Sequence, residues 1–181
     1  MPKPFHVPQK VVLQMNFKMN KMETLEVKNT MPKQGLMTGS QAVVQALMAE
    51  GVDLMFGYPG GAIMPVYDAL YDVEEELKHV LARHEQGAVH AAQGYARATG
   101  KVGVCLATSG PGATNLITPM LDMTNDSTPG IFITGQVPLK AIGSNAFQEA
   151  PSIELSKHVT KYSKQITSII DIEKELDKAF K

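Results

Sequence analysis

The sequence is poor in several residue types, and each shortage excludes some kinds of protein. It has no tryptophan, one cysteine, and aromatic residues make up only 6% of the chain. A single cysteine excludes an intramolecular disulfide. Its place inside the apolar run Val104-Cys105-Leu106 predicts a small buried side chain. This cysteine usage is typical of a reducing compartment, so we expect a cytoplasmic protein.

Charge of one sign and long apolar runs are also missing. The formal net charge is −1 and charged residues make up 19% of the chain, so no long-range field favours nucleic acid or an anionic membrane as a partner. No apolar run approaches the roughly 18 to 20 residues that cross a bilayer. We therefore expect a soluble protein.

The first 33 residues differ in composition from the rest. Prolines interrupt them, and six lysines oppose only Glu23 and Glu26. A transit peptide is typically rich in arginine and serine, and this segment has neither. We expect residues 1–33 to be a basic, disordered leader, and a start codon placed too early is favoured over targeting. With 181 residues in total, the remaining 34–181 suffice for one domain.

Predicted helices and strands alternate through that domain. Apolar residues spaced by three and four predict a first helix capped by Thr38 or Ser40 and ended by Gly51. Strands are predicted over 52–56, 79–82, 102–107, 131–134 and 162–166, and further helices from Pro65 and over 85–98, 111–122, 152–158 and 171–180. Such alternation predicts an α/β fold in three layers, α/β/α, around a parallel sheet.

Two strand-to-helix turns follow one another and suggest a site. The first is Arg83-His84-Glu85-Gln86-Gly87, and the second runs from Thr108 to Asn115. In an open parallel sheet such turns lie side by side at the carboxyl ends of the strands, where ligands bind. The first turn offers the carboxylate of Glu85, and the second offers backbone at Gly110-Pro111-Gly112. On spacing alone, Glu85 is most simply a partner of the helix dipole, and the glycines match the dinucleotide fingerprint only weakly.

Three other features receive simpler interpretations. We interpret the acidic run Glu74-Glu75-Glu76 as a solvated loop and not as a paired catalytic set, because adjacent residues do not share a helical face. His84 and His90 are not at zinc-binding spacing, so no metal site is predicted. The aperiodic segment 135–151 reads as a functional or mobile connection.

Several motifs are similar to those of one enzyme family. They are Phe56 to Leu70 with the core Gly57-Tyr58-Pro59-Gly60-Gly61, Arg83 to Gly87, Gly94 to Gly100, Ala107 to Thr118, Ile133 to Pro138, and Ala146-Phe147-Gln148-Glu149. Their order resembles the catalytic subunit of acetolactate (acetohydroxyacid) synthase over about residues 38–151. The resemblance implies the aminopyrimidine-binding domain of thiamine diphosphate enzymes.

The resemblance also implies roles for individual residues. Glu85 corresponds to the family's catalytic glutamate, which hydrogen-bonds the N1′ nitrogen of the cofactor and acts as an acid and base through its ring. Together with Glu85, the implied cofactor-binding residues are Tyr58, Pro59, Gly60, Thr108, Pro111 and Asn115. The residues implied to face the substrate are Gly61, Phe147 and Gln148.

The implied reaction is decarboxylation of pyruvate and ligation to a second 2-oxo acid such as 2-oxobutyrate. The products would be acetolactate or acetohydroxybutyrate, on the path to branched-chain amino acids. The family also uses Mg²⁺ and FAD, held mainly by domains beyond the matching motifs, and forms homodimers or larger assemblies with a possible regulatory subunit. We therefore expect this chain to be the N-terminal part of such an enzyme and to be inactive alone.

Two alternatives stay open at this point. One is another thiamine diphosphate decarboxylase or oxidase acting on a different 2-oxo acid, and the other is a non-catalytic binding or assembly module. One departure from the family also has a structural consequence, because Pro119 lies inside the helix predicted over 111–122. A proline inside a helix costs about 3 kcal/mol unless the helix kinks.

Overall fold

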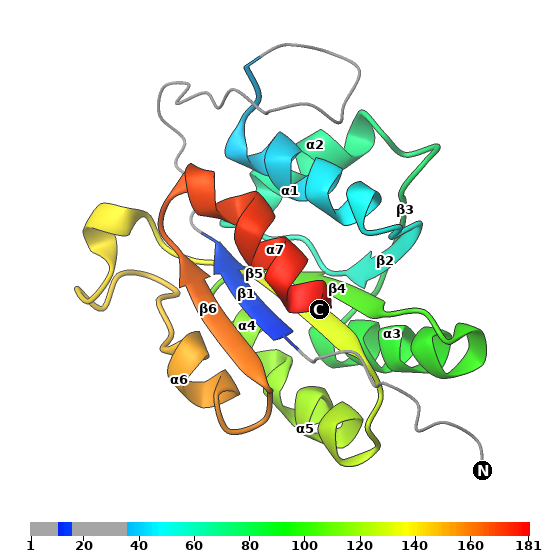
Figure 1. Cartoon of the computed structure of the whole chain (residues 1–181). Helices are drawn as coiled ribbons and strands as arrows, with labels where there is room; N and C mark the ends of the chain where they lie inside the picture. Colours follow the sequence, from blue (N-terminus) through cyan, green and yellow to red (C-terminus); the bar gives the residue numbers. More distant parts are fainter. Residues whose placement is uncertain (1–10, 16–35) are drawn as a thin grey trace.

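A computed structural model describes residues 11–15 and 36–181 of the chain. The described residues form a six-stranded sheet in the order β3-β2-β4-β5-β1-β6, and every neighbouring pair is parallel (Figure 1). The strands are β1 Val11–Met15, β2 Leu54–Gly57, β3 Lys78–Leu81, β4 Gly103–Ala107, β5 Gly130–Gly135 and β6 Tyr162–Ile166.

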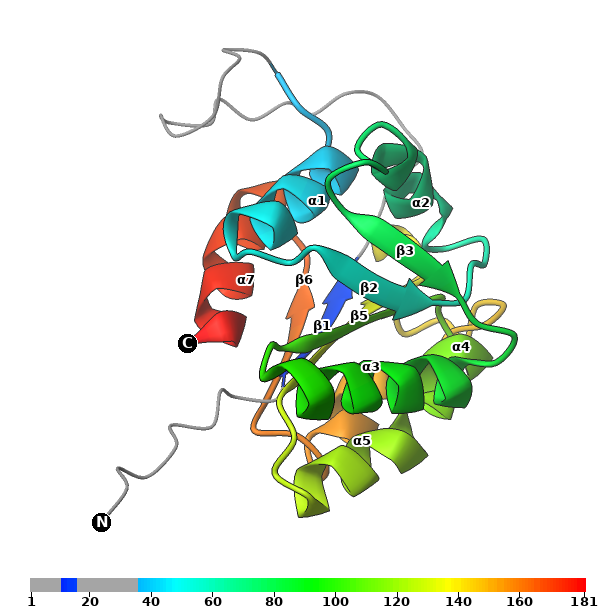
Figure 2. The ribbon, with the colours of Figure 1, turned by 90° about the vertical axis from the view of Figure 1, so that its right-hand side faces the viewer.

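Helices cover both faces of the sheet, as Figure 2 shows for the two sides of the β2 and β4 strands. They are α1 Gly39–Ala49, α2 Met64–Tyr71, α3 Glu85–Thr99, α4 Pro111–Asn115, α5 Ile117–Asn125, α6 Ser152–Ser156 and α7 Ile172–Phe180, with short 3₁₀ turns at Leu139–Ala141 and Ile169–Asp171. One apolar cluster joins α1, α2 and α7 to the sheet, and a second joins α3, α5 and α6 to its other face. The predicted three-layer α/β/α architecture is confirmed.

The central strands β4 and β5 are buried along their whole length. This is expected of parallel strands that are covered on both faces. Cys105 lies in β4 and is fully buried, as predicted. β3 is one of the two edge strands, and Leu81 at its end is 63% exposed.

The sequence signals at the ends of α1 are confirmed. The hydroxyl of Thr38 accepts a hydrogen bond from the Gln41 backbone N–H at 3.2 Å, and the Thr38 backbone N–H donates to the Gln41 side chain at 2.9 Å. This reciprocal pair is a capping box. Gly51 follows the helix with φ 77°, the left-handed conformation that glycine adopts most easily. The other strands and helices of residues 36–181 lie within two residues of their predicted bounds, apart from the helix predicted over 111–122.

That helix is divided into α4 and α5. Pro119 has no backbone N–H, and its ring would clash with the carbonyl of Asn115 in a continuous helix. The break falls directly after Asn115, which places Pro119 in the first turn of α5. A proline is well tolerated in the first turn. The kink also ends α4 at Asn115, so this side chain stands at the end of a short helix near the sheet edge.

The strand β1 is a difference from the sequence prediction. No strand was expected in residues 1–33, yet Val11–Met15 pairs with β5 on one side and β6 on the other. The β-branched and apolar run Val11-Val12-Leu13 is the local signal for it. The other residues of the expected leader lie outside the described part, so the division into leader and domain stays a prediction. Among residues 11–15 and 36–181, no helix is long and apolar enough to cross a membrane.

Candidate functional site

The candidate site lies where β2, β3 and β4 end and their following turns meet. Glu85 is the first residue of α3 and only 7% exposed. His84 caps the helix, because its Nδ1 accepts a hydrogen bond from the Gln86 backbone N–H at 3.2 Å. The side-chain amide of Asn115 donates to Glu85 Oε2 at 2.9 Å. Two residues that are 30 positions apart in the sequence are thus joined at the site.

Two glycines let Thr108 approach the Glu85–Asn115 pair closely. A Cβ on Gly60 would lie 2.6 Å from the Cβ of Thr108, and a Cβ on Gly112 would lie 2.7 Å from Thr108 Cγ2 and 3.1 Å from Glu85 Oε1. Side chains at either position would collide with the site. The hydroxyl of Thr108 is buried and has no hydrogen-bond partner among the described residues. A buried unpartnered hydroxyl is costly, which makes this oxygen a candidate ligand-binding group.

The turn after β4 also contacts the connection that follows β5. Gly110 has φ 58°, and a Cβ on it would lie 2.6 Å from the backbone oxygen of Gln148. Gln148 itself has φ 60°, and Phe147 before it is 89% exposed. The backbone of Gln148 therefore packs on the glycine turn, and the ring of Phe147 extends into solvent.

The remaining predicted residues lie at the rim. The backbone N–H of Tyr58 donates to the Leu106 carbonyl at 3.2 Å, which ties the turn after β2 to β4, and the Tyr58 side chain is 40% exposed. Pro59 is partly buried, whereas Gly61 and Pro111 are exposed. The structure thus brings Gly60, Glu85, Thr108 and Asn115 together by contact and leaves the other predicted residues around them.

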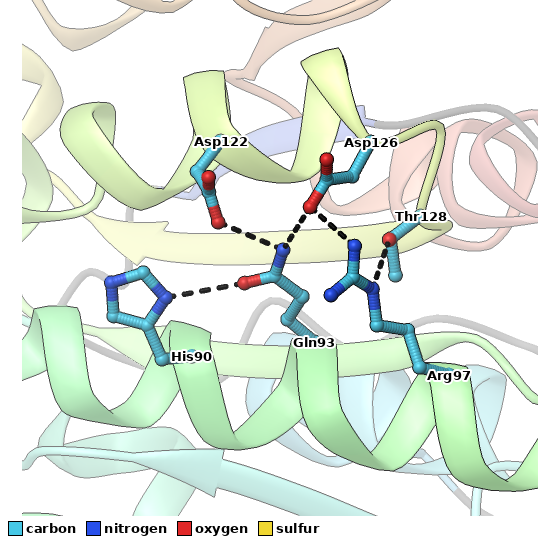
Figure 3. Close-up of polar contacts among 6 residues, drawn as sticks. All are labelled: His90, Gln93, Arg97, Asp122, Asp126 and Thr128. Atoms are coloured by element: carbon cyan, nitrogen blue, oxygen red, sulfur yellow. Dashed lines mark hydrogen bonds and ion pairs between the residues drawn. The ribbon is translucent and has the colours of Figure 1, made fainter.

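A polar network behind the site fixes α3 against α5 (Figure 3). Gln93 is 6% exposed, and its amide donates to Asp122 at 2.8 Å and to Asp126 at 3.3 Å. The guanidinium of Arg97 pairs with the same Asp126, and His90 contacts the Gln93 oxygen at 3.2 Å. Sequence reasoning missed this network, because its members lie about 30 residues apart with no shared motif. It orients the helix that begins with Glu85.

A second missed pair lies beneath the turn that follows β2. The hydroxyl of Tyr67 is 3.1 Å from His79 Nε2, and the two rings meet edge to face. Burial raises the pKa of the Tyr67 hydroxyl and lowers the pKa of His79. A Cβ on Gly57 would lie 2.6 Å from the Tyr67 hydroxyl, so the pair packs directly on the last residue of β2.

Among the described residues, Glu85 belongs neither to a metal-binding group of side chains nor to the lining of either of two surface hollows. Within the described ranges, no group of three or more His, Cys, Asp or Glu side chains is arranged to hold a metal ion. Two hollows of about 340 and 220 Å³ lie elsewhere, one between α1 and α2 and the other beside Gly100. The Glu85 cluster therefore lies at the carboxyl ends of the strands and not in either hollow.

Comparison with known proteins identifies the class. Residues 37–155 match the family described as thiamine pyrophosphate enzyme, N-terminal TPP binding domain. The chain belongs to this family, whose cofactor is thiamine diphosphate.

Within this family, curated relatives of the chain are acetolactate synthases. The chain is 58% identical over 144 residues to the acetolactate synthase isozyme 2 large subunit of Escherichia coli. These 144 residues are 80% of this chain and 26% of the relative. The chain is 55% identical over 144 residues to an acetolactate synthase of Mycobacterium bovis, covering 80% and 23%. A probable acetolactate synthase large subunit of Methanocaldococcus jannaschii is 53% identical over 144 residues, covering 80% and 24%. The chain thus spans about a quarter of the length of these relatives.

Proposed function

We propose that this chain supplies the aminopyrimidine side of the thiamine diphosphate site of an acetolactate synthase. The observation that carries the proposal is the contact of Glu85 with Asn115 beside the unpartnered hydroxyl of Thr108. The identities of 53 to 58% to acetolactate synthases favour this activity over other thiamine diphosphate decarboxylases.

The residues present fit the cofactor. Gly60 and Gly112 leave backbone without side chains at the site, and the Thr108 hydroxyl lacks a partner there. We propose that Tyr58, Pro59, Gly60, Thr108, Pro111 and Asn115 form the wall around the rings of thiamine diphosphate. When bound, thiamine diphosphate supplies the carbanion chemistry that decarboxylates 2-oxo acids.

Glu85 is the proposed proton-holding group. Asn115 engages its Oε2, and this hydrogen bond orients the carboxyl group. The other oxygen, Oε1, is the one that would meet a side chain at position 112, where glycine leaves the space open. We assign Oε1 the role of holding a proton against a ring nitrogen of the pyrimidine. A buried carboxyl group in this position acts as a general acid and base.

The proposed substrates are pyruvate and a second 2-oxo acid, such as pyruvate again or 2-oxobutyrate. Gly61, Phe147 and Gln148 are the proposed substrate-facing residues, since Gly61 follows Gly60 in the chain and the Gln148 backbone packs on Gly110. Mg²⁺, FAD, the catalytic-subunit dimer and a regulatory subunit belong to the proposal for the whole enzyme. A cytoplasmic location is proposed on the same basis, supported by the single buried cysteine.

A chimera tests the proposal. Residues 37–155 replace the corresponding segment of the Escherichia coli isozyme 2 large subunit, and acetolactate is measured with pyruvate, thiamine diphosphate, Mg²⁺ and FAD. We expect acetolactate formation by the chimera and none by the isolated 181-residue chain. A folded chimera that binds the cofactor but forms product only from other 2-oxo acids would favour a different decarboxylase. A folded chimera with no thiamine diphosphate binding would leave this segment a structural role.

A further inference from the structure

The connection between β5 and α6 carries two of the three proposed substrate-facing residues, Phe147 and Gln148, and projects from the sheet beside β6 (Figure 1). We call residues 139–149 the projecting loop. Its base is closed by Gln136, which is 5% exposed. The Gln136 amide donates to the Ala150 carbonyl at 3.3 Å, and its oxygen accepts from the Val137 backbone N–H at 2.9 Å. The two ends of the loop are thereby held together.

The carboxylate of Glu149 closes the tip of the loop. One oxygen accepts a hydrogen bond from the Gly143 backbone N–H, and the other accepts from the Ala146 backbone N–H at 3.1 Å. The Glu149 backbone N–H in turn donates to the Ala146 carbonyl at 2.9 Å. Hydrogen bonds from the Gly143 and Ala146 backbone lower the pKa of Glu149. Bonds of this kind to an ionised acceptor are stronger than neutral ones.

The loop backbone needs such support. Asn145 and Gln148 have φ of 56° and 60°, a region that side chains other than glycine rarely adopt. They flank Phe147 on both sides, with Ala146 between Asn145 and Phe147. Since the left-handed conformation is intrinsically unfavourable, the Glu149 hydrogen bonds, together with the bonds of Ser144 to the Ala141 carbonyl, help to hold this part of the loop in place.

The loop is also seated on the candidate site. The Gln148 backbone packs on Gly110, in the turn that leads to Asn115. A loop anchored at this contact and closed by Glu149 places Phe147 and Gln148 at a defined position relative to the Glu85 cluster.

We propose that Glu149 is a positioning residue for substrate binding. Its carboxylate organises the projecting loop so that Phe147 and Gln148 line the place of the 2-oxo acid. The proposal rests on the proposed function and deepens it, since the Glu149 carboxylate accepts hydrogen bonds from the loop backbone and acts through its two neighbours.

The first experiment uses the 181-residue chain and needs no activity. Amide NMR signals of Gly143 and Ala146 are followed while the pH is lowered, in the unchanged chain, in Glu149→Gln and in Glu154→Gln. Glu154 is the control, because it is an exposed carboxylate on α6 that is bonded to no loop amide. We expect both amides to titrate together with a midpoint below the usual glutamate pKa of about 4.3. In Glu149→Gln this titration should vanish and amide exchange should quicken by about tenfold or more, with no change in Glu154→Gln. Amides that are indifferent to Glu149 would overturn the proposal.

The second experiment separates positioning from general stability. In the chimera with residues 37–155, Glu149→Gln should raise KM for pyruvate about tenfold, while kcat and the affinity for thiamine diphosphate change by less than about twofold. Glu149→Ala should raise KM further, since glutamine retains one acceptor oxygen. Glu154→Gln should leave both constants unchanged.

The outcomes distinguish this proposal from the proposed function. A well-folded chimera without acetolactate formation defeats the proposed function. An active chimera whose KM is unaffected by Glu149→Gln, or whose kcat falls in parallel with a loss of cofactor binding, defeats the positioning role of Glu149.

Discussion

Replacing Gly112 by alanine should disturb the site through one identifiable contact. The added Cβ would lie 2.7 Å from Thr108 Cγ2 and 3.1 Å from Glu85 Oε1, and the third nearest atom, Thr108 Cβ, is 3.6 Å away. Overpacking of this kind costs about 1 to 3 kcal/mol. Alanine also gains about 1 kcal/mol over glycine in a helix, which offsets part of the loss. We expect Gly112→Ala to lower the free energy of unfolding by up to about 2 kcal/mol.

The same geometry predicts a rescue. Thr108→Ser removes Cγ2, the nearest atom, and by itself costs about 1 kcal/mol for the lost methyl group. In the double variant the closest contact, with Thr108 Cγ2, is removed while that with Glu85 Oε1 stays, so the two changes should be coupled favourably by about 1 to 2 kcal/mol. Urea unfolding of the 181-residue chain followed by far-UV circular dichroism measures each corner of the cycle, because the chain has no tryptophan.

Gly94→Ala is the matched control for this cycle. Gly94 also lies in a helix, α3, and a Cβ there meets nothing within 4 Å. We expect it to be neutral or to stabilise the chain by up to about 1 kcal/mol. If Gly112→Ala is as well tolerated as Gly94→Ala, or if Thr108→Ser brings no rescue, the close approach of Thr108 to the helix α4 is refuted.

Three further predictions concern the fold. Gln93→Glu should destabilise the chain by about 2 kcal/mol near neutral pH, because a side chain that donates to two aspartates becomes a third carboxylate. Stability should recover as the pH falls and the new carboxylate is protonated. Urea unfolding at pH 5 and pH 8 measures this, and equal losses of stability at the two pH values would contradict the prediction. Tyr67→Phe should cost about 1 to 2 kcal/mol in the same assay, since it leaves His79 Nε2 without its partner, and an unchanged midpoint would refute the pairing. Burial lowers the pKa of His79, so unfolding takes up a proton and stability should fall as the pH drops below about 6.5. A His79→Gln chain should lose that part of the pH dependence of stability. A stability profile identical to that of the unchanged chain would contradict the lowered pKa of His79.

Much of the fold could be predicted because the sequence signals are local. The continuous apolar runs around Cys105 and Phe132 predict buried parallel strands, and the cap at Thr38 with Gly51 predicts a complete helix. The strand Val11–Met15 could not be predicted, because the pairing of a short strand depends on tertiary contacts and not on its local sequence. Here β1 lies between β5 and β6, far from it in the sequence.

The candidate site was predictable in part for the same reason. Glu85 follows β3 and Asn115 follows β4, the two strands on either side of β2, so both residues lie at the carboxyl ends of neighbouring parallel strands. The seat of Gln148 on Gly110 could not be foreseen, because it depends on left-handed backbone at a residue that is not glycine. Nor did any motif mark the Tyr67–His79 pair, which is formed by ordinary side chains of a helix and an edge strand. The roles of the cofactor-binding and substrate-facing residues stay predictions.

The most direct test of the account is the effect of Glu85→Gln in the chimera with residues 37–155. Glutamine keeps the shape of the side chain and the contact with Asn115 but cannot exchange a proton at the pyrimidine. We expect thiamine diphosphate to bind with similar affinity and acetolactate formation to fall by about 10² to 10⁴-fold. Turnover equal to that of the unsubstituted chimera, with the cofactor bound, would contradict the claim that this carboxyl group carries the chemistry.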